Sequence, residues 1–236
     1  MSANEEALRG LYPFLHGEAK DPAREHAALL ESIRAKAADS VRVKQEFFAR
    51  HAEDLVRVAH AIATSYRQGG TLFSMGNGGS SCDAAHVAVE FKHPVTAGRP
   101  ALAAVNLCMD TAMISAVAND VGYRHVFLRQ IEAMGRRNDC LIGFSTSGNS
   151  ENLMDAFAKA KTMGITTIGL AGMSGGAMAA SPDLDHCLVV RTDSIHRVQE
   201  CHLAIYHILW DLVHTLLADQ RGGLQAKGIR TCCTDN

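Results

Sequence analysis

Apolar residues in the middle of this chain form short continuous runs that alternate with longer amphipathic stretches. Five of the runs have the length of buried strands, and they cover residues 71–75, 101–107, 139–144, 165–170 and 186–190. Helix-period segments lie between them, near residues 81–92, 111–118, 124–135 and 150–163. Continuous apolar strands separated by helices are typical of a parallel sheet covered on both faces. The pattern therefore predicts an α/β fold, a three-layer α/β/α sandwich with a five-stranded parallel sheet.

Helical patterns flank this alternating region on both sides. Two amphipathic helices are predicted before it, over residues 23–37 and 40–67, and Gly69 and Gly70 end the second one. A last long helix is predicted from Arg197 to Ala218. We expect a single domain with an N-terminal helical segment, between a loose extension and a disordered tail, with the boundaries 1–22, 23–218 and 219–236.

Two of the predicted strand-to-helix connections have the composition of anion-binding loops. The first, residues 76–79, reads Gly-Asn-Gly-Gly, and Ser80 or Ser81 can cap the helix after it. The second, residues 145–150, reads Ser-Thr-Ser-Gly-Asn-Ser. Backbone N–H groups at a helix N-terminus and hydroxyl groups both donate hydrogen bonds to phosphate. A tight turn without a ligand would explain either loop alone, but two copies favour a phosphorylated small molecule. Neither loop has the pattern that binds a nucleoside triphosphate or a dinucleotide.

Three polar side chains on the predicted helices are candidates for chemistry. His86 and Glu90 are four residues apart, so they share one face of the helix after the first loop. The same spacing is also that of an ordinary surface pair. His207 lies in an apolar part of the last helix, where a histidine is more often a core residue than a ligand. Position alone leaves both interpretations open for each residue.

Composition narrows the class of protein. The chain has 236 residues, enough for one sizeable core, and its 23 basic and 25 acidic residues nearly balance. We therefore expect no nucleic acid and no membrane as partners, and no apolar run has the length that spans a bilayer. The seven cysteines are scattered without a CxxC pair, and the N-terminus lacks the order of a signal peptide. These features predict a reduced, cytoplasmic protein without a disulfide framework.

Five separated motifs resemble one family of enzymes. They are Gly76-Asn77-Gly78-Gly79-Ser80 with Cys82-Asp83-Ala84 and His86-x-x-x-Glu90, then Asn119-Asp120, Ser145-Thr146-Ser147-Gly148-Asn149-Ser150, Arg197-Val198-Gln199-Glu200-x-His202, and the terminal His207. Across residues 40–218 the chain resembles the sedoheptulose-7-phosphate isomerases (phosphoheptose isomerases) of the sugar-isomerase, or SIS, domain superfamily. The resemblance implies a flavodoxin-like SIS fold and an aldose–ketose isomerase of the EC 5.3.1 class. It implies interconversion of sedoheptulose 7-phosphate and D-glycero-D-manno-heptose 7-phosphate, which feeds heptose synthesis for bacterial surface lipopolysaccharide.

The resemblance also implies roles for individual residues. The family's catalytic pair matches Glu90 and His207. Many members hold a zinc ion, Zn2+, and its ligands match His86, Glu90, Gln199 and His207. The hydroxyl groups that hold the sugar phosphate match Ser145, Thr146, Ser147 and Ser150. The remaining substrate positions match Asn77, Gly78, Gly79, Ser80, Asn119 and Asp120, together with Glu90 and Gln199.

Two segments depart from the family pattern near the sugar end of the expected site. Members usually carry Gly-Arg shortly after the catalytic glutamate, and this chain has Phe91-Lys92-His93-Pro94. Thr or Asp is more usual near His196. An isomerase of another ketose phosphate or of a hexosamine phosphate is therefore one alternative. A non-catalytic regulator on the same domain, of the replication-initiation factor type, is the other, although that branch lacks the His-x-x-x-Glu and terminal His positions.

The last helix predicts an assembly. Gln199 and His207 are eight residues apart, about 12 Å along a continuous helix, whereas zinc–ligand distances are about 2 Å. Either the helix begins after Gln199, or the two residues serve different copies of the site. The helix is also apolar over too much of its circumference for a surface helix. We expect a homo-oligomer, the tetramer seen across the resembling family, with active sites at subunit interfaces.

Overall fold

The computed structural model describes residues 22–96 and 98–218. The expectations for the N-terminal extension and for the tail with Cys232 and Cys233 lie outside these residues. The chain divides after Arg42 into two compact units. The single domain over residues 23–218 stays a prediction, and the sheet with all the helices that cover it belongs to the second unit.

The N-terminal helical segment is one helix, α2, which runs from Pro22 to Arg67. The prediction of two helices with a break between residues 37 and 40 is therefore wrong. Asp39 and Ser40 have the composition of a new helix start, but no glycine or proline interrupts the ladder there. Asp39 instead accepts a hydrogen bond from Arg42 one turn later, 2.6 Å from its guanidinium. The end at Arg67, before Gly69 with its positive φ of 79°, is as expected.

The five predicted strands form one parallel sheet, which confirms the α/β prediction. The strands are β1 (Leu72–Gly76), β2 (Ala104–Asn106), β3 (Cys140–Ser145), β4 (Thr166–Gly172) and β5 (His186–Val190). Their order across the sheet is β2-β1-β3-β4-β5, and all neighbours are parallel. Gly76 of β1 is paired with Phe144 of β3. Both anion-type loops therefore begin side by side, at the carboxyl ends of adjacent strands where the strand order reverses.

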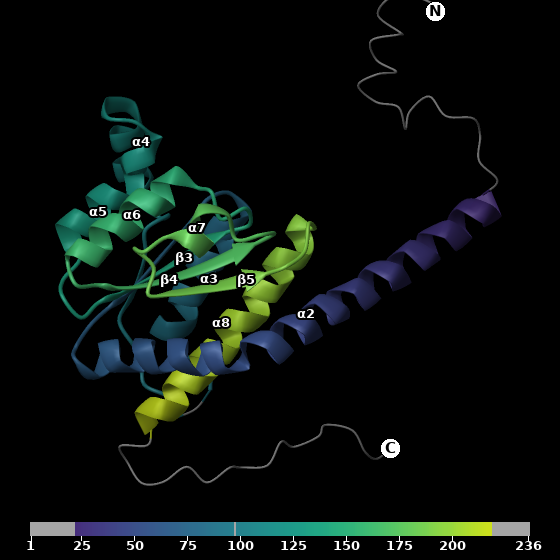
Figure 1. Ribbon diagram of the computed structural model, residues 1–236, viewed down its shortest axis with the longest axis horizontal. Coiled ribbons are helices and arrows are strands. Elements are labelled where there is room, and N and C mark those ends of the chain that lie inside the picture. The colour runs from purple at the N-terminus through teal and green to yellow at the C-terminus, as the bar shows by residue number, and fades with distance from the viewer. Residues whose placement is uncertain (1–21, 97, 219–236) are drawn as a thin grey trace, which may run out of the picture. The chain divides into compact units, whose positions relative to one another are not determined.

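Helices cover both faces of the sheet. They are α3 (Gly79–Lys92), α4 (Thr111–Asp120), the 3-10 turn η2 (Tyr123–His125), α5 (Val126–Met134), α6 (Glu151–Thr162), α7 (Gly176–Ala180) and α8 (Ile195–Ala218). One core lies under α3, α8 and the second half of α2, and the other under α4 to α7 (Figure 1). Leu72 and Phe73, neighbours in β1, belong to opposite cores, as the alternation of side chains along a strand requires.

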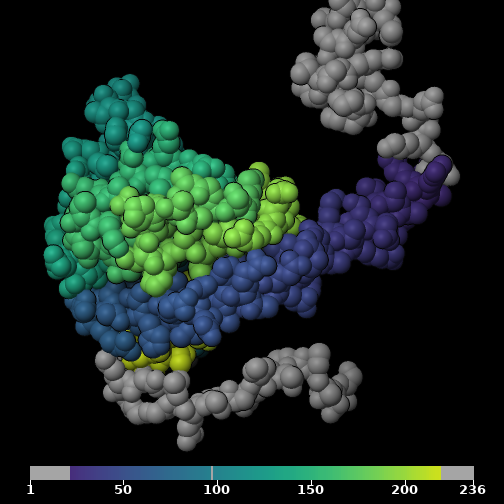
Figure 2. All heavy atoms as spheres, viewed as in Figure 1, coloured from purple at the N-terminus to yellow at the C-terminus, as the bar shows by residue number. Residues whose placement is uncertain are grey.

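Two helices differ in character from the rest. Helix α4 projects beyond the body of the second unit, and most of its side chains are exposed (Figure 2). Helix α8 is, among the described residues, the one helix whose length and composition would allow it to cross a membrane, contrary to the expectation that no run is long enough. Its apolar side chains Val198, Ile205 and Leu209 are buried in the core, so one face of the helix packs against the sheet.

Candidate active site

The glycine-rich loop is shaped by close backbone contacts. At Gly76 an added Cβ would lie 2.3 Å from the carbonyl oxygen of Ser80, so only glycine fits. Helix α3 begins at Gly79 and is capped by Gly78 with φ 53°, without a side-chain cap. The prediction that Ser80 or Ser81 caps this helix is therefore wrong, because the helix starts earlier. The Ser81 hydroxyl instead donates to the carbonyl oxygen of Gly78, at 2.6 Å.

A pair of amides joins this loop to the start of α6. Asn77 Nδ2 donates to Asn152 Oδ1 and Asn152 Nδ2 donates to Asn77 Oδ1, both at 2.9 Å. The hydroxyl of Tyr123 in η2 also donates to Asn77 Oδ1, at 3.0 Å. Asn77 therefore joins three elements at one edge of the sheet. Sequence reasoning missed Asn152 and Tyr123, and the one signal for Asn152 was a poor helix former in the first turn of a predicted helix.

The second loop gathers hydroxyl groups at the N-terminus of α6. Ser145 Oγ lies 3.0 Å from Ser150 Oγ and accepts a hydrogen bond from the backbone N–H of Gly148, at 3.1 Å. Ser147 Oγ accepts from the backbone N–H of Asn149, at 3.3 Å. Gly148 has φ 69°, and a Cβ there would lie 2.0 Å from the Gly175 carbonyl oxygen. Hydroxyl and amide donors near a helix N-terminus are the arrangement that binds phosphate.

Helices α3 and α8 pack side by side and run in the same direction. Gln199 faces Gly79, where an added Cβ would lie 2.2 Å from Gln199 Nε2. Two turns on, the Tyr206 hydroxyl lies 2.8 Å from His86 Nδ1, and one turn further Trp210 Nε1 donates to the carbonyl oxygen of Glu90, at 2.9 Å. In each of these three pairs the residue numbers differ by 120, as expected for two parallel helices with the same rise per residue.

This packing brings His86, Glu90 and His207 together. Each offers one ligand atom, and these atoms lie within 4.8 Å of one another. His86 Nε2 lies 3.1 Å from Glu90 Oε1, and the ring centroids of His86 and His207 are 5.0 Å apart. Burial lowers the pKa of His207, a neighbouring His86 charge lowers it further, and Glu90 opposes both. Within residues 22–96 and 98–218 no other group of three histidine, cysteine or acidic side chains has this proximity.

The three side chains fit a zinc ion. Ligands bound tetrahedrally at about 2.1 Å lie about 3.4 Å apart. His86 Nε2 and Glu90 Oε1 are 3.1 Å apart, and all three ligand atoms lie within 4.8 Å of one another. Two imidazoles and one carboxylate are ordinary zinc ligands. Glu90 and His86 are half-buried and His207 is exposed, so the group is open to solvent on one side.

Gln199 lies apart from this group within one chain. Helix α8 begins at Ile195, so the alternative that the helix starts after Gln199 is wrong. Gln199 is level with Gly79, seven residues or about 10 Å along α3 from His86. A shared metal would require Gln199 of another copy, which stays a prediction.

The remaining sugar positions lie on the projecting helix. Asn119 and Asp120 are exposed at the end of α4, and Asn119 Nδ2 donates to Asp120 Oδ1 at 2.8 Å. A short segment leads from Asp120 to Tyr123, whose hydroxyl donates to Asn77 in the glycine-rich loop. Within the described residues neither Asn119 nor Asp120 belongs to the group formed by His86, Glu90 and His207.

Two buried groups near the three-residue group were not predicted to take part. Tyr206 is 1% exposed, and its hydroxyl lies against His86. Asp83 is 8% exposed, and its Oδ2 has no hydrogen-bond partner in the described structure. Burial raises the pKa of Asp83 to about 7. In the sequence Asp83 belongs to one of the motifs and Tyr206 to none, and neither residue type gave a sign of burial in a helix.

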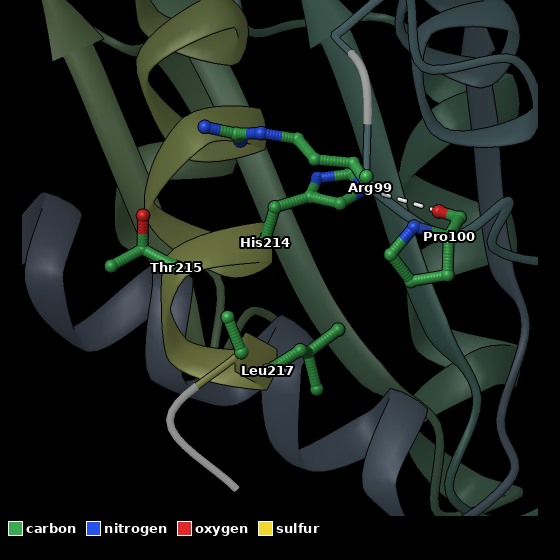
Figure 3. A pocket seen from close by; sticks show the side chains of 7 residues that line it. Arg99, Pro100, His214, Thr215 and Leu217 are labelled. Carbon is green, nitrogen blue, oxygen red and sulfur yellow. Dashed lines mark hydrogen bonds between the residues drawn. The ribbon is translucent and has the colours of Figure 1, made fainter. Parts of the chain in front are cut away.

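A cavity of about 140 Å³ lies elsewhere, near the end of α8 (Figure 3). Its lining includes Arg99, Pro100, His214 and Leu217, and His214 Nε2 lies 3.3 Å from the carbonyl oxygen of Pro100. None of the predicted site residues lines it. His214 is seven residues, about 10 Å of helix, beyond His207. The cavity is therefore separate from the candidate active site.

Comparison with known proteins agrees with the fold. The family model for the SIS domain matches residues 37–172, so the class of protein is an SIS domain protein. The phosphoheptose isomerase of Desulfovibrio desulfuricans is 42% identical over 196 residues, covering 83% of this chain and 92% of the relative. The chain belongs to the phosphoheptose isomerase family of SIS domain proteins, and it is an isomerase.

Solved structures support the same assignment. The phosphoheptose isomerase of Neisseria gonorrhoeae is similar with a TM-score of 0.74 and 36% identity, covering 79% of this chain and 99% of that one. That of Francisella tularensis has a TM-score of 0.75 and 32% identity, covering 79% and 98%. The five-stranded parallel sheet and its flanking helices are thus the SIS fold, as expected.

Proposed function

We propose that this protein interconverts sedoheptulose 7-phosphate and D-glycero-D-manno-heptose 7-phosphate in the cytoplasm, for bacterial surface lipopolysaccharide. The observation that carries the proposal is the approach of Glu90, His86 and His207 to one another. The same chain has two loops rich in hydrogen-bond donors, which begin at adjacent strand ends. The substrate follows from the family, since the relatives are phosphoheptose isomerases.

Glu90 and His207 have the chemistry that the reaction needs. Moving a carbonyl from C2 to C1 requires a base to remove a proton from C1 and return it to C2. The Glu90 carboxylate does this, while the His207 imidazole moves a proton from the C1 oxygen to the C2 oxygen. Each product then carries the same atoms as the substrate, with two protons relocated through an enediol.

The two loops supply binding rather than proton transfer. The hydroxyls of Ser145, Ser147 and Ser150, with Thr146, hold the phosphate at the N-terminus of α6, where the helix dipole favours an anion. The Asn77 amide and the α3 N-terminus at Gly78 and Gly79 line the sugar.

A zinc ion is the proposed cofactor, held by His86, Glu90 and His207, with Gln199 contributed by a second copy. When bound, a metal polarises the carbonyl and stabilises the enediolate. A glutamate that ligates a metal is a weaker base. We therefore assign proton transfer to the carboxylate oxygen of Glu90 that would not bind the metal. Assembly as a tetramer would place Gln199 and the exposed His207 at a subunit interface.

An isomerase of another ketose phosphate is the second candidate, because of the two departures from the family pattern. Helix α3 ends at Lys92, and Pro94 closes the segment Phe91-Lys92-His93-Pro94, near which members usually carry Gly-Arg. His196 lies exposed in the first turn of α8. A non-catalytic regulator is disfavoured, because the chain retains the three side chains that the regulator branch lacks and belongs to an isomerase family.

One assay tests the proposal. Purified protein is incubated with sedoheptulose 7-phosphate in D2O and followed by NMR, with fructose 6-phosphate as the comparison substrate. We expect the heptose aldose to form with deuterium at C2, and fructose 6-phosphate to react slowly. Conversion of fructose 6-phosphate alone would favour the second candidate. Absence of any conversion, with and without added zinc, would contradict the proposed function.

A further inference from the structure

Tyr206 makes a buried contact that none of the assigned roles uses. Its hydroxyl lies 2.8 Å from Nδ1 of His86, while the other nitrogen of that ring, Nε2, lies 3.1 Å from Glu90 Oε1. The His86 ring is therefore held at both nitrogens, by α8 on one side and by α3 on the other. Tyr206 is 1% exposed, so water does not compete for the hydroxyl.

The Tyr206 ring is itself fixed by three aromatic neighbours. Its centroid lies 5.3 Å from that of His86, 4.9 Å from that of His207 and 5.9 Å from that of Phe144, all close to edge-to-face. These are ordinary distances for favourable ring pairs. Phe144 immediately precedes the phosphate loop. The position of the hydroxyl is thus set by the same packing that positions the site.

The Tyr206 hydroxyl suits either state of the His86 ring. A neutral phenol can either donate or accept a hydrogen bond, unlike a carbonyl or a carboxylate. Tyr206 can therefore donate to Nδ1 when Nε2 carries the proton, and accept from Nδ1–H when Nε2 holds a metal.

We propose that Tyr206 is a positioning residue, whose hydroxyl orients the His86 ring so that Nε2 points at Glu90 and His207. The effect of Tyr206 on metal binding rests on the proposed function, whereas its effect on the orientation of the His86 ring does not. Partners that bind the second nitrogen of a ligating histidine commonly contribute 10- to 100-fold to metal affinity. The hydroxyl of Tyr206 is such a partner.

The test compares Tyr206→Phe with Tyr66→Phe. Both changes remove one buried or half-buried phenol hydroxyl and keep the ring, but the Tyr66 hydroxyl donates to the carbonyl oxygen of Ala103 instead, at 3.2 Å. Two measurements are made on each variant. Nitrogen-15 NMR of the metal-free protein reports the state of His86 Nδ1, and competition against a chelator gives the affinity for Co2+ and Zn2+.

In Tyr206→Phe we expect the His86 Nδ1 resonance to move to the position of a nitrogen without a hydrogen bond. Metal affinity should fall about 10- to 100-fold, with the Co2+ absorption spectrum altered, and Tyr66→Phe should behave like the wild type. An unchanged Nδ1 resonance in Tyr206→Phe overturns the proposal. So does a loss of metal affinity that Tyr66→Phe shares. If the wild type binds no metal, the proposed cofactor fails, and the NMR result alone decides the role of Tyr206.

Discussion

Replacing Asp83 with asparagine should change how the stability of this protein depends on pH. The Asp83 carboxyl is buried, one oxygen has no partner, and burial raises its pKa from 3.8 to about 7. Between these values the folded state binds this proton more tightly than the unfolded state does. The free energy of unfolding therefore falls as pH rises from about 4 to 7, because an increasing charge must be kept in a poorly solvated place.

The size of the effect follows from the two pKa values. A pKa difference of about three between the folded and unfolded states lowers the free energy of unfolding by about 4 kcal/mol once the carboxyl is fully ionised in both states. Between pH 5 and pH 8 the change is about 2.5 kcal/mol. Asparagine has nearly the same shape and cannot ionise, so Asp83→Asn removes this slope. Any cost from its own unpaired amide is the same at each pH.

Urea unfolding of the metal-free wild type and of Asp83→Asn, at pH 5 and pH 8 and one protein concentration, measures the difference. We expect the variant to gain about 1–3 kcal/mol relative to the wild type between the two pH values. Asp193→Asn, a change at an exposed aspartate, is the control and should give no such gain. A difference between wild type and Asp83→Asn that stays constant within about 0.5 kcal/mol would refute the reasoning about burial.

Three further outcomes are expected. Glu90→Gln should retain substrate binding while kcat falls by about 10² or more, and near-normal turnover would remove Glu90 as the base. Ser147→Ala with Ser150→Ala removes two donors, each contributing about 1.5–3 kcal/mol to a charged acceptor, so KM should rise steeply, with little loss of thermal stability in the absence of ligand; an unchanged KM would mean that the loop is only a turn. Light scattering should give a mass several times 25.3 kDa, whereas an active monomer would contradict the interfacial site.

The sequence alone was sufficient to predict the strands, the helices that cover the sheet, and the two anion-type loops. Each predicted strand is a mostly apolar run of five to seven residues, although β2 itself covers only Ala104–Asn106. Each covering helix shows a helical period of apolar residues, so residues close in the sequence were enough to predict these elements. The loops at Gly76 and Ser145 were readable for the same reason, since glycine and hydroxyl residues act locally on the backbone. The break predicted between residues 37 and 40 failed because Asp39 and Ser40 are compatible with both a helix start and a helix interior.

Tertiary structure decided which residues meet. His207 is 117 residues beyond Glu90 (207 − 90), and no local pattern states that α8 packs parallel to α3 with a constant offset. Because of that packing, His86 and Glu90, which the sequence left open as a surface pair, lie beside His207, which the sequence left open as a core residue. The same packing places Gln199 about two helical turns away from them. Asn152 and Tyr206 gained their partners in the same way. Which side chains meet depends on how one helix or strand is aligned along another. That alignment is set by how their buried faces fit together, and the spacing of residues within one short segment does not specify it.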